Sequence, residues 1–155
     1  MPSVFKKLNL KDQKQIVVLN APESFNRELG SLRDVTVLRD ATAAKQIEFS
    51  LAFVTRQKEI DVIVKSIARK TTGDAIVWFA YPKGASKKYQ CDFNRDQGWE
   101  PLGKAGFEPV RMVAIDEDWS ALRFRRAEFI KTMKRAAEHR ISAEGRAKRQ
   151  PNSPR

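Results

Sequence analysis

The alternation of short apolar runs with helical patterns restricts the fold class of this chain more than any other sequence feature. Six runs are typical of β-strands, because apolar, β-branched and aromatic residues dominate them. These runs lie at residues 16–19, 35–38, 49–54, 75–81, 110–115 and 121–125. Helices are expected from Pro22 to Gly30, after Thr55, and within residues 98–106. This alternation predicts an α/β fold with a mostly parallel sheet, and the last two runs predict a terminal antiparallel hairpin.

The length and composition of the chain predict one packed domain and exclude several kinds of site. The chain has 155 residues, 41% of them hydrophobic, and we place the domain at residues 1–126. Cys91 is the single cysteine and His139 the single histidine, which excludes an intramolecular disulfide framework and a cysteine-based zinc cluster. This scarcity also disfavours catalysis by a histidine base. We therefore expect no catalytic residues, no bound metal and no cofactor.

The sequence has neither a signal peptide nor a membrane span. The first residues lack the apolar region of a signal peptide, and no stretch approaches the roughly 20 apolar residues that cross a bilayer. We therefore expect a cytoplasmic protein without membrane association.

Positive charge is concentrated at the C-terminal end. The net charge is +11, and residues 127–155 carry 8 of the 30 basic and 3 of the 19 acidic side chains. We expect a basic amphipathic helix over residues 127–141 and a disordered basic tail over residues 142–155. Basic side chains that neutralise phosphates release counterions, so weak association with nucleic acid is predicted. The predicted nucleic-acid-binding residues are Arg123, Arg125, Lys131, Lys134, Arg135, Arg140, Arg146, Lys148 and Arg149. Solubility alone is the alternative role of this charge.

Three segments, in order, resemble the S-adenosylmethionine-dependent methyltransferases. Residues 7–11 (KLNLK) resemble the lead-in to that family's first strand, residues 72–77 (TGDAIV) its turn into a central strand, and residues 105–108 (AGFE) its entry to the closing hairpin. The resemblance implies a Rossmann-like three-layer sandwich with strand order 2-1-3-4-6-5 and an antiparallel last strand.

The turn after the first strand departs from that family. The family has a glycine-rich turn there, which lets the backbone approach the cofactor. Here the turn is Asn20-Ala21-Pro22-Glu23, in which no glycine is present, Pro22 lacks an N–H group and Glu23 adds a negative charge. We therefore expect that S-adenosylmethionine does not bind appreciably and that the chain is not a functional methyltransferase.

Four further motifs resemble a bacterial family of uncharacterised domain proteins. They are LNAP at residues 19–22, YPK at 81–83, NRD at 94–96 and WSALRFR at 119–125. This resemblance implies no activity.

The strand order implied by the first resemblance places a ligand site at one edge of the sheet. In open α/β sheets, ligands bind beyond the carboxyl ends of the strands, where the strand order reverses. That point lies between the first and third strands. The predicted ligand-binding residues are Asn20, Pro22, Thr55, Lys83, Asp92 and Arg95. In the alternative, Asn20 and Thr55 cap helices, Lys83 is solvated, and Asp92 pairs with Arg95. Arg123 and Arg125 are expected on the outer face of an edge strand.

Three functions are consistent with these patterns. The first is a non-catalytic methyltransferase-like domain that binds a small anionic ligand or a protein partner. The second is an enzyme of unassigned chemistry at the carboxyl edge of the sheet. The third is a nucleic-acid-associated protein that acts through its basic tail. The missing glycines favour the first over methyl transfer.

Overall fold

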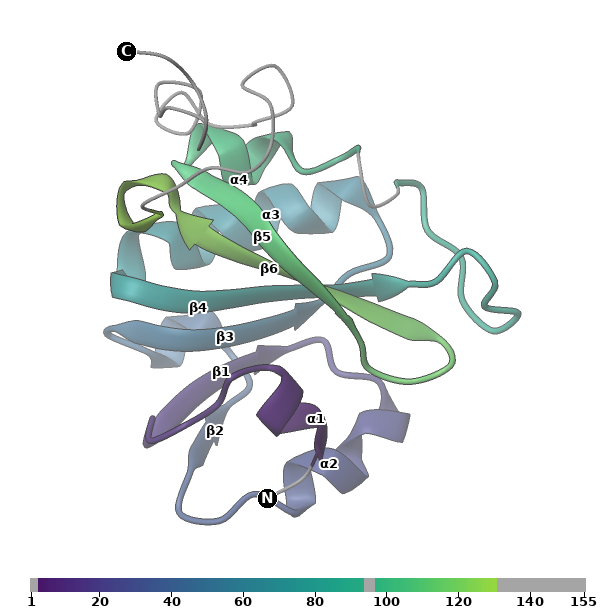
Figure 1. Ribbon diagram of the computed structural model, residues 1–155, viewed down its shortest axis with the longest axis horizontal. Coiled ribbons are helices and arrows are strands. Elements are labelled where there is room, and N and C mark those ends of the chain that lie inside the picture. Colours follow the sequence, from purple (N-terminus) through teal and green to yellow (C-terminus); the bar gives the residue numbers. More distant parts are fainter. Residues whose placement is uncertain (1–2, 94–96, 131–155) are drawn as a thin grey trace, which may run out of the picture.

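A six-stranded sheet organises the computed structural model, which describes residues 3–93 and 97–130 (Figure 1). The strands are β1 Gln15–Leu19, β2 Thr36–Leu38, β3 Ile47–Phe53, β4 Thr71–Pro82, β5 Phe107–Ala114 and β6 Trp119–Arg126. Their order is β2-β1-β3-β4-β6-β5, with β2, β1, β3 and β4 parallel and β6 antiparallel to both β4 and β5. The predicted α/β class, strand order and antiparallel hairpin are confirmed.

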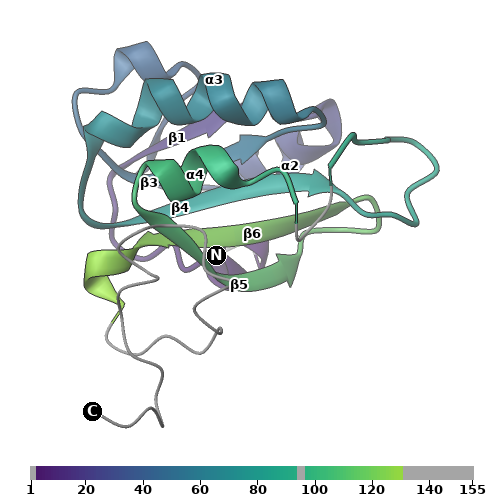
Figure 2. The same ribbon diagram turned by 90° about the horizontal axis from the view of Figure 1, so that it is seen from above.

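Helices cover both faces of the sheet and complete three layers (Figure 2). The α-helices are α1 Ser3–Lys7, α2 Asn26–Gly30, α3 Gln57–Ile67 and α4 Glu100–Lys104. The 3-10 turns are η1 Glu23–Phe25, η2 Ala41–Ala43, η3 Ala68–Lys70 and η4 Ala127–Phe129. α3 and α4 pack on one face, and α1 and η1 on the other. No helix in the described part of the chain is both long and apolar enough to span a membrane.

The helix expected after Thr55 is α3, and it packs on the sheet through one apolar stripe. Ile60, Ile63, Val64 and Ile67 are all buried against the sheet. Burying a side chain of this size contributes about 1.5–3 kcal/mol, so this apolar stripe holds α3 in place.

The opposite face is closed by α1, which the sequence analysis did not predict. Phe5 and Leu8 at this N-terminal segment are fully buried. The indole Nε1 of Trp78 in β4 donates a hydrogen bond of 2.8 Å to the carbonyl oxygen of Leu8. The segment before β1 is therefore part of the core.

β4 contains a bulge near its start, and Gly73 lies in it. Ile47 pairs with Thr71, but Phe49 pairs with Ile76, so β4 has extra residues at this point. Gly73 lies among them with a φ of 57°, a conformation that glycine adopts without strain.

The expectation that Arg123 and Arg125 lie on an edge strand is wrong. They are in β6, which lies between β4 and β5, and β5 is the edge strand of the sheet. The hairpin folds back so that β6 pairs with β4 as well as with β5, which leaves β5 at the edge.

The end of the described chain continues the packed body beyond residue 126. Ala127 and Ile130 are buried, and η4 is a single 3-10 turn at the start of the predicted 127–141 helix. The rest of that helix and the 142–155 tail lie outside the described residues.

Candidate functional site

The carboxyl ends of the parallel strands share one edge of the sheet with the start of β6. β4 extends past β3 there, and Trp119, the first residue of β6, pairs with Pro82, the last residue of β4 (Figure 1). The turn after β1, the start of α3 and the loop after β4 all reach this edge.

The turn after β1 is left-handed at Asn20. Asn20 is exposed and has a φ of 59°, a conformation that asparagine tolerates better than most residues other than glycine. Pro22 is half-buried, and its carbonyl oxygen accepts a hydrogen bond of 2.9 Å from the N–H of Phe25. Glu23 is exposed to solvent. Asn20 thus adopts a left-handed conformation at the turn where the methyltransferase family has glycines.

Thr55 joins the end of β3 to the start of α3. Its N–H and hydroxyl donate to Oε1 of Glu59 at 2.8 and 3.1 Å, and the N–H of Arg56 donates to the same oxygen at 3.0 Å. Glu59, rather than Thr55, therefore provides the acceptor at the start of this helix.

Asp92 also stabilises the start of α3. Its Oδ1 accepts a hydrogen bond of 2.7 Å from the N–H of Gln57, and its own N–H donates to the carbonyl oxygen of Thr55 at 3.3 Å. The loop after β4 is thereby attached to α3. Arg95, the predicted ion-pair partner of Asp92, lies outside the described residues.

The loop after β4 is also attached to the hairpin turn before β6. The N–H of Lys83 donates to the carbonyl oxygen of Asp118 at 2.8 Å, and the hydroxyl of Ser86 donates to Oδ1 of Asp118 at 2.9 Å. The N–H of Tyr89 donates to the Ser86 hydroxyl at 3.1 Å. Two sets of hydrogen bonds therefore shape the loop after β4.

A pocket of about 610 Å³ lies between this loop and the ends of β4 and β6. Its walls combine aromatic, hydroxyl and cationic groups. They include Tyr81, Lys83, Ser86, Tyr89, Phe93 and Ser120. The hydroxyl of Tyr81 donates to Sδ of Met112 at 3.2 Å, and the Cys91 thiol donates to the carbonyl oxygen of Phe93 at 2.8 Å. Lys83 is half-buried.

The structure divides the predicted ligand residues into two groups. Thr55, Lys83 and Asp92 lie around the ends of β3 and β4. Leu19 pairs with Ala52 and Ala52 with Phe79, so Asn20 is level with Ala80. Lys83 is three residues further along β4, about 10 Å at 3.3 Å per residue. Asn20 and Pro22 therefore lie one strand or more away from the Lys83 pocket.

Sequence reasoning missed Ser86 and Tyr89 as wall residues of the pocket. The short spacing of hydroxyl-bearing residues after Lys83 was the available signal, but Asp118, which holds the loop, is 32 residues from Ser86 in sequence. That distance hides the contact from any local pattern.

A row of aromatic rings borders the same edge. The centroid distances are 5.0 Å for Phe25–Phe53, 5.1 Å for Phe53–Trp119 and 4.8 Å for Trp119–Tyr89. The indole Nε1 of Trp119 is buried and has no hydrogen-bond partner. Trp119 and Trp78 are both buried, as expected of core aromatics.

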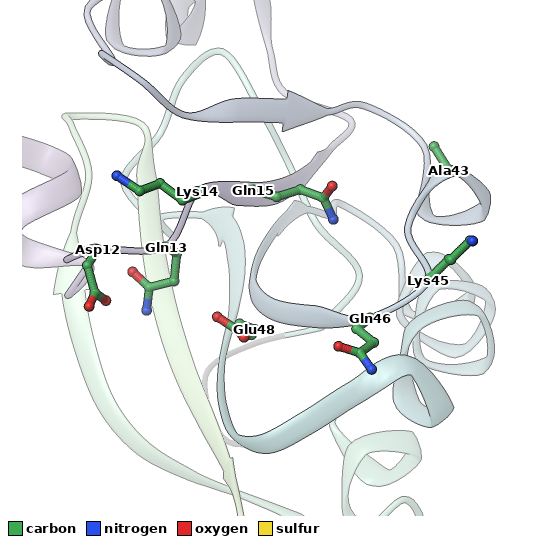
Figure 3. Close-up of a pocket in the computed structure, with 8 residues that line it drawn as sticks. All are labelled: Asp12, Gln13, Lys14, Gln15, Ala43, Lys45, Gln46 and Glu48. Atoms are coloured by element: carbon green, nitrogen blue, oxygen red, sulfur yellow. The ribbon is translucent and has the colours of Figure 1, made fainter.

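A larger hollow, about 710 Å³, lies at the opposite edge, before β1 and β3 (Figure 3). Figure 3 shows Lys14 and Lys45 at opposite sides of an open space, with Gln15 and Glu48 between them. Its other side chains are short or polar, and its charges are of both signs. This hollow is larger than the Lys83 pocket, but it lacks aromatic walls and is at the edge where open α/β sheets do not bind ligands. Among residues 3–93 and 97–130, no group of histidine, cysteine, aspartate and glutamate could hold a metal ion.

The fold resembles solved methyltransferases. A SAM dependent methyltransferase from Aquifex aeolicus aligns with a TM-score of 0.52 and 14% identity, over 80% of this chain and 88% of that one. The N-methyltransferase NodS from Bradyrhizobium japonicum aligns with a TM-score of 0.52 and 10% identity, over 80% and 93%. The pyocyanin biosynthetic protein PhzM aligns with a TM-score of 0.52 and 11% identity over 79% of this chain, which spans 54% of PhzM. No model of a protein family matches the chain, and no curated protein does.

These neighbours correct the preference for a non-catalytic domain and the expectation that the chain is not a functional methyltransferase. That expectation rested on the missing glycines, on Glu23 and on the scarcity of histidine and cysteine. The sheet nevertheless resembles that of solved methyltransferases, Asn20 makes the left-handed turn without glycine, and the charge of Glu23 is exposed to water. The scarcity of histidine and cysteine is also a weak objection, because transfer from a sulfonium releases a neutral thioether, a leaving group that needs no proton.

Proposed function

We propose that this chain binds a small organic ligand with an anionic group in the Lys83 pocket, at the carboxyl edge of its methyltransferase-like sheet. The observation that carries the proposal is the composition of that pocket. It combines aromatic rings, two serine hydroxyls and a half-buried lysine in about 610 Å³. A few polar groups within largely apolar walls are typical of ligand sites of this size.

Each wall has a distinct role in this proposal. The rings of Tyr89 and Phe93 offer flat apolar surfaces to a planar group, and the hydroxyl of Ser120 exchanges hydrogen bonds with its polar atoms, while the Ser86 hydroxyl holds the loop through Asp118 and Tyr89. The ammonium group of Lys83 attracts a carboxylate or phosphate as a compact charge. Because the Lys83 backbone is hydrogen-bonded to Asp118, the base of this side chain is fixed before a ligand arrives.

The fold implies S-adenosylmethionine as the first ligand to test. Its adenine ring and carboxylate match the aromatic and cationic walls in chemistry. When bound, this molecule supplies a methyl group on a positively charged sulfur. The contribution of the chain would then be to hold the carboxylate through Lys83 and to exclude water with the loop after β4.

Calorimetric titration of the full chain with S-adenosylmethionine and S-adenosylhomocysteine tests the proposal. We expect micromolar binding of at least one of them. Loss of a charge-assisted hydrogen bond costs about 1.5–3 kcal/mol, so Lys83→Ala should weaken binding at least tenfold. Lys11→Ala is the matched control, because Lys11 is exposed before β1, and it should leave the affinity unchanged.

Native mass spectrometry of freshly purified protein widens the test to other ligands. A retained small molecule that Lys83→Ala loses and Lys11→Ala keeps would support the proposal. If neither adenosyl compound binds and no small molecule is retained, the proposed function is wrong.

A further inference from the structure

Three arginine side chains gather on the face of the sheet that carries α1. Arg111 in β5 pairs directly with Arg123 in β6, and Arg125 follows two residues later. Residues two apart in a strand lie on the same face, and directly opposed residues have Cβ atoms about 4.5–5.5 Å apart. Trp119 and Ala121, four and two residues before Arg123, pack in the α1 core, which identifies this face.

Like charges placed opposite one another on a sheet destabilise it. The structure compensates this repulsion at one end of the cluster only. Arg125 forms a two-pronged ion pair with Asp74, with Nε–Oδ1 at 3.0 Å and Nη2–Oδ2 at 2.5 Å. Glu108 is directly opposite Arg125 as well. Both carboxylates therefore lie at the Arg125 end.

Arg123 is less well compensated than Arg125. Its Nε is buried and has no hydrogen-bond partner. Burial, and then the neighbouring charge of Arg125, lower the pKa of Arg123 below its ordinary value; the charge of Asp74 offsets part of this effect and the charge of Arg111 adds to it. A buried donor without a partner costs free energy, so the Arg123 end of the cluster is less stable than the Arg125 end.

We propose that Arg111 and Arg123 bind the phosphate backbone of a nucleic acid on the α1 face of β5 and β6. A guanidinium offers paired donors in the geometry that phosphate oxygens accept, and such contacts position a nucleic acid without reading its sequence. The phosphate would place an anion directly beside Arg111 and Arg123, whereas Asp74 forms its ion pair with Arg125.

Two observations favour a polymer over a free phosphate ion. The arginines lie side by side on neighbouring strands, where successive phosphates of one strand can reach them. The net charge of +11 favours such an encounter.

Fluorescence anisotropy with a labelled single-stranded oligonucleotide tests this proposal on the full chain. Arg111→Ala with Arg123→Ala should weaken binding at least tenfold at low salt. The slope of log K against log salt should fall by about 1.4, since each lost phosphate contact removes about 0.7 for a single strand. Arg39→Ala with Arg69→Ala is the matched control, because both arginines are exposed elsewhere and the net charge changes equally. This control should change the affinity less than twofold.

Two more variants separate binding from folding. Arg111→Ala alone removes an exposed side chain, so it should weaken binding about threefold or more without lowering the thermal midpoint. Asp74→Asn should strengthen binding, because it releases Arg125 from its ion pair. Equal effects of the arginine pair and its control would overturn the proposal. Stabilisation of the protein by inorganic phosphate, without any binding of the oligonucleotide, would overturn the proposal too.

Discussion

The carboxylate of Asp92 accepts a hydrogen bond of 2.7 Å from the backbone N–H of Gln57, 35 residues earlier in the chain. This bond satisfies one of the free N–H groups at the start of α3 and attaches the loop after β4 to that helix. Asp92, which was predicted to bind a ligand, thus forms a structural hydrogen bond. It holds in place the loop that lines the Lys83 pocket.

Removing this attachment should destabilise the protein. Asp92→Ala should lower the free energy of unfolding by about 1 kcal/mol, as other helix caps do, and Asp92→Asn should lower it less because the amide oxygen still accepts. Urea denaturation checks both values. Asp61→Ala is a useful control, because its ion pair with Lys65 on the surface of α3 contributes little. Equal stability of Asp92→Ala and the wild type would contradict this role.

The left-handed turn at Asn20 predicts a dependence on side-chain shape. Asn20→Val should lower the free energy of unfolding by about 1–2 kcal/mol, because a β-branched residue is strained at a φ of 59°. Asn20→Gly should be close to neutral, since glycine adopts this conformation freely. Chemical denaturation of the two variants measures the difference. A valine variant as stable as the glycine variant would show that the turn relaxes.

The two buried tryptophans form a matched pair of substitutions. Trp78→Phe leaves the Leu8 carbonyl oxygen without its partner, whereas the Trp119 Nε1 has no partner to lose. Both substitutions remove similar volume, so Trp78→Phe should cost about 1–2 kcal/mol more than Trp119→Phe. Thermal and urea unfolding give this difference. A larger loss at Trp119 would contradict the importance of the bond that holds α1.

Stability in acid should depend on Asp40. Hydrogen bonds from Thr42, first from its backbone N–H and then from its side chain, lower the pKa of Asp40 below its ordinary value of 3.8. A carboxyl group with a lowered pKa stabilises the fold above its unfolded value and loses that contribution as the pH falls through the folded value. Asp40→Asn should therefore flatten the stability curve below about pH 4. Unfolding curves between pH 2 and pH 7 test this, and unchanged curvature would count against it.

The end of the packed body can be located by truncation. Ala127 and Ile130 are buried, and Arg125 donates a hydrogen bond of 3.1 Å to the carbonyl oxygen of Phe129. A chain that ends at Arg126 should therefore be about 2 kcal/mol less stable than one that ends at Ile130, from the lost apolar burial. Calorimetric melting of the two chains compares them. The same pair, titrated with an oligonucleotide, shows how much binding the predicted basic tail contributes.

The sequence by itself determined those helices and strands of this protein that form because of a short local pattern of apolar residues. Residues 75–81 form the centre of β4 because a long apolar run is stable only when both faces are covered, and α3 forms where Ile60, Ile63, Val64 and Ile67 make one apolar stripe. The strand order was implied by the resemblance to the methyltransferases, and the structure confirmed it.

Only the tertiary structure decided which distant residues meet. The hydrogen bond of Asp92 to Gln57, that of Ser86 to Asp118, and the indole bond that holds α1 all join residues more than 30 positions apart. The pairing of Arg111 with Arg123 depends on the register after a bulge at Pro109, and a shift of one residue would place them on opposite faces. Such contacts depend on packing and register, which local patterns do not specify. The Lys83 pocket, which is the candidate ligand site, depends on such long-range contacts.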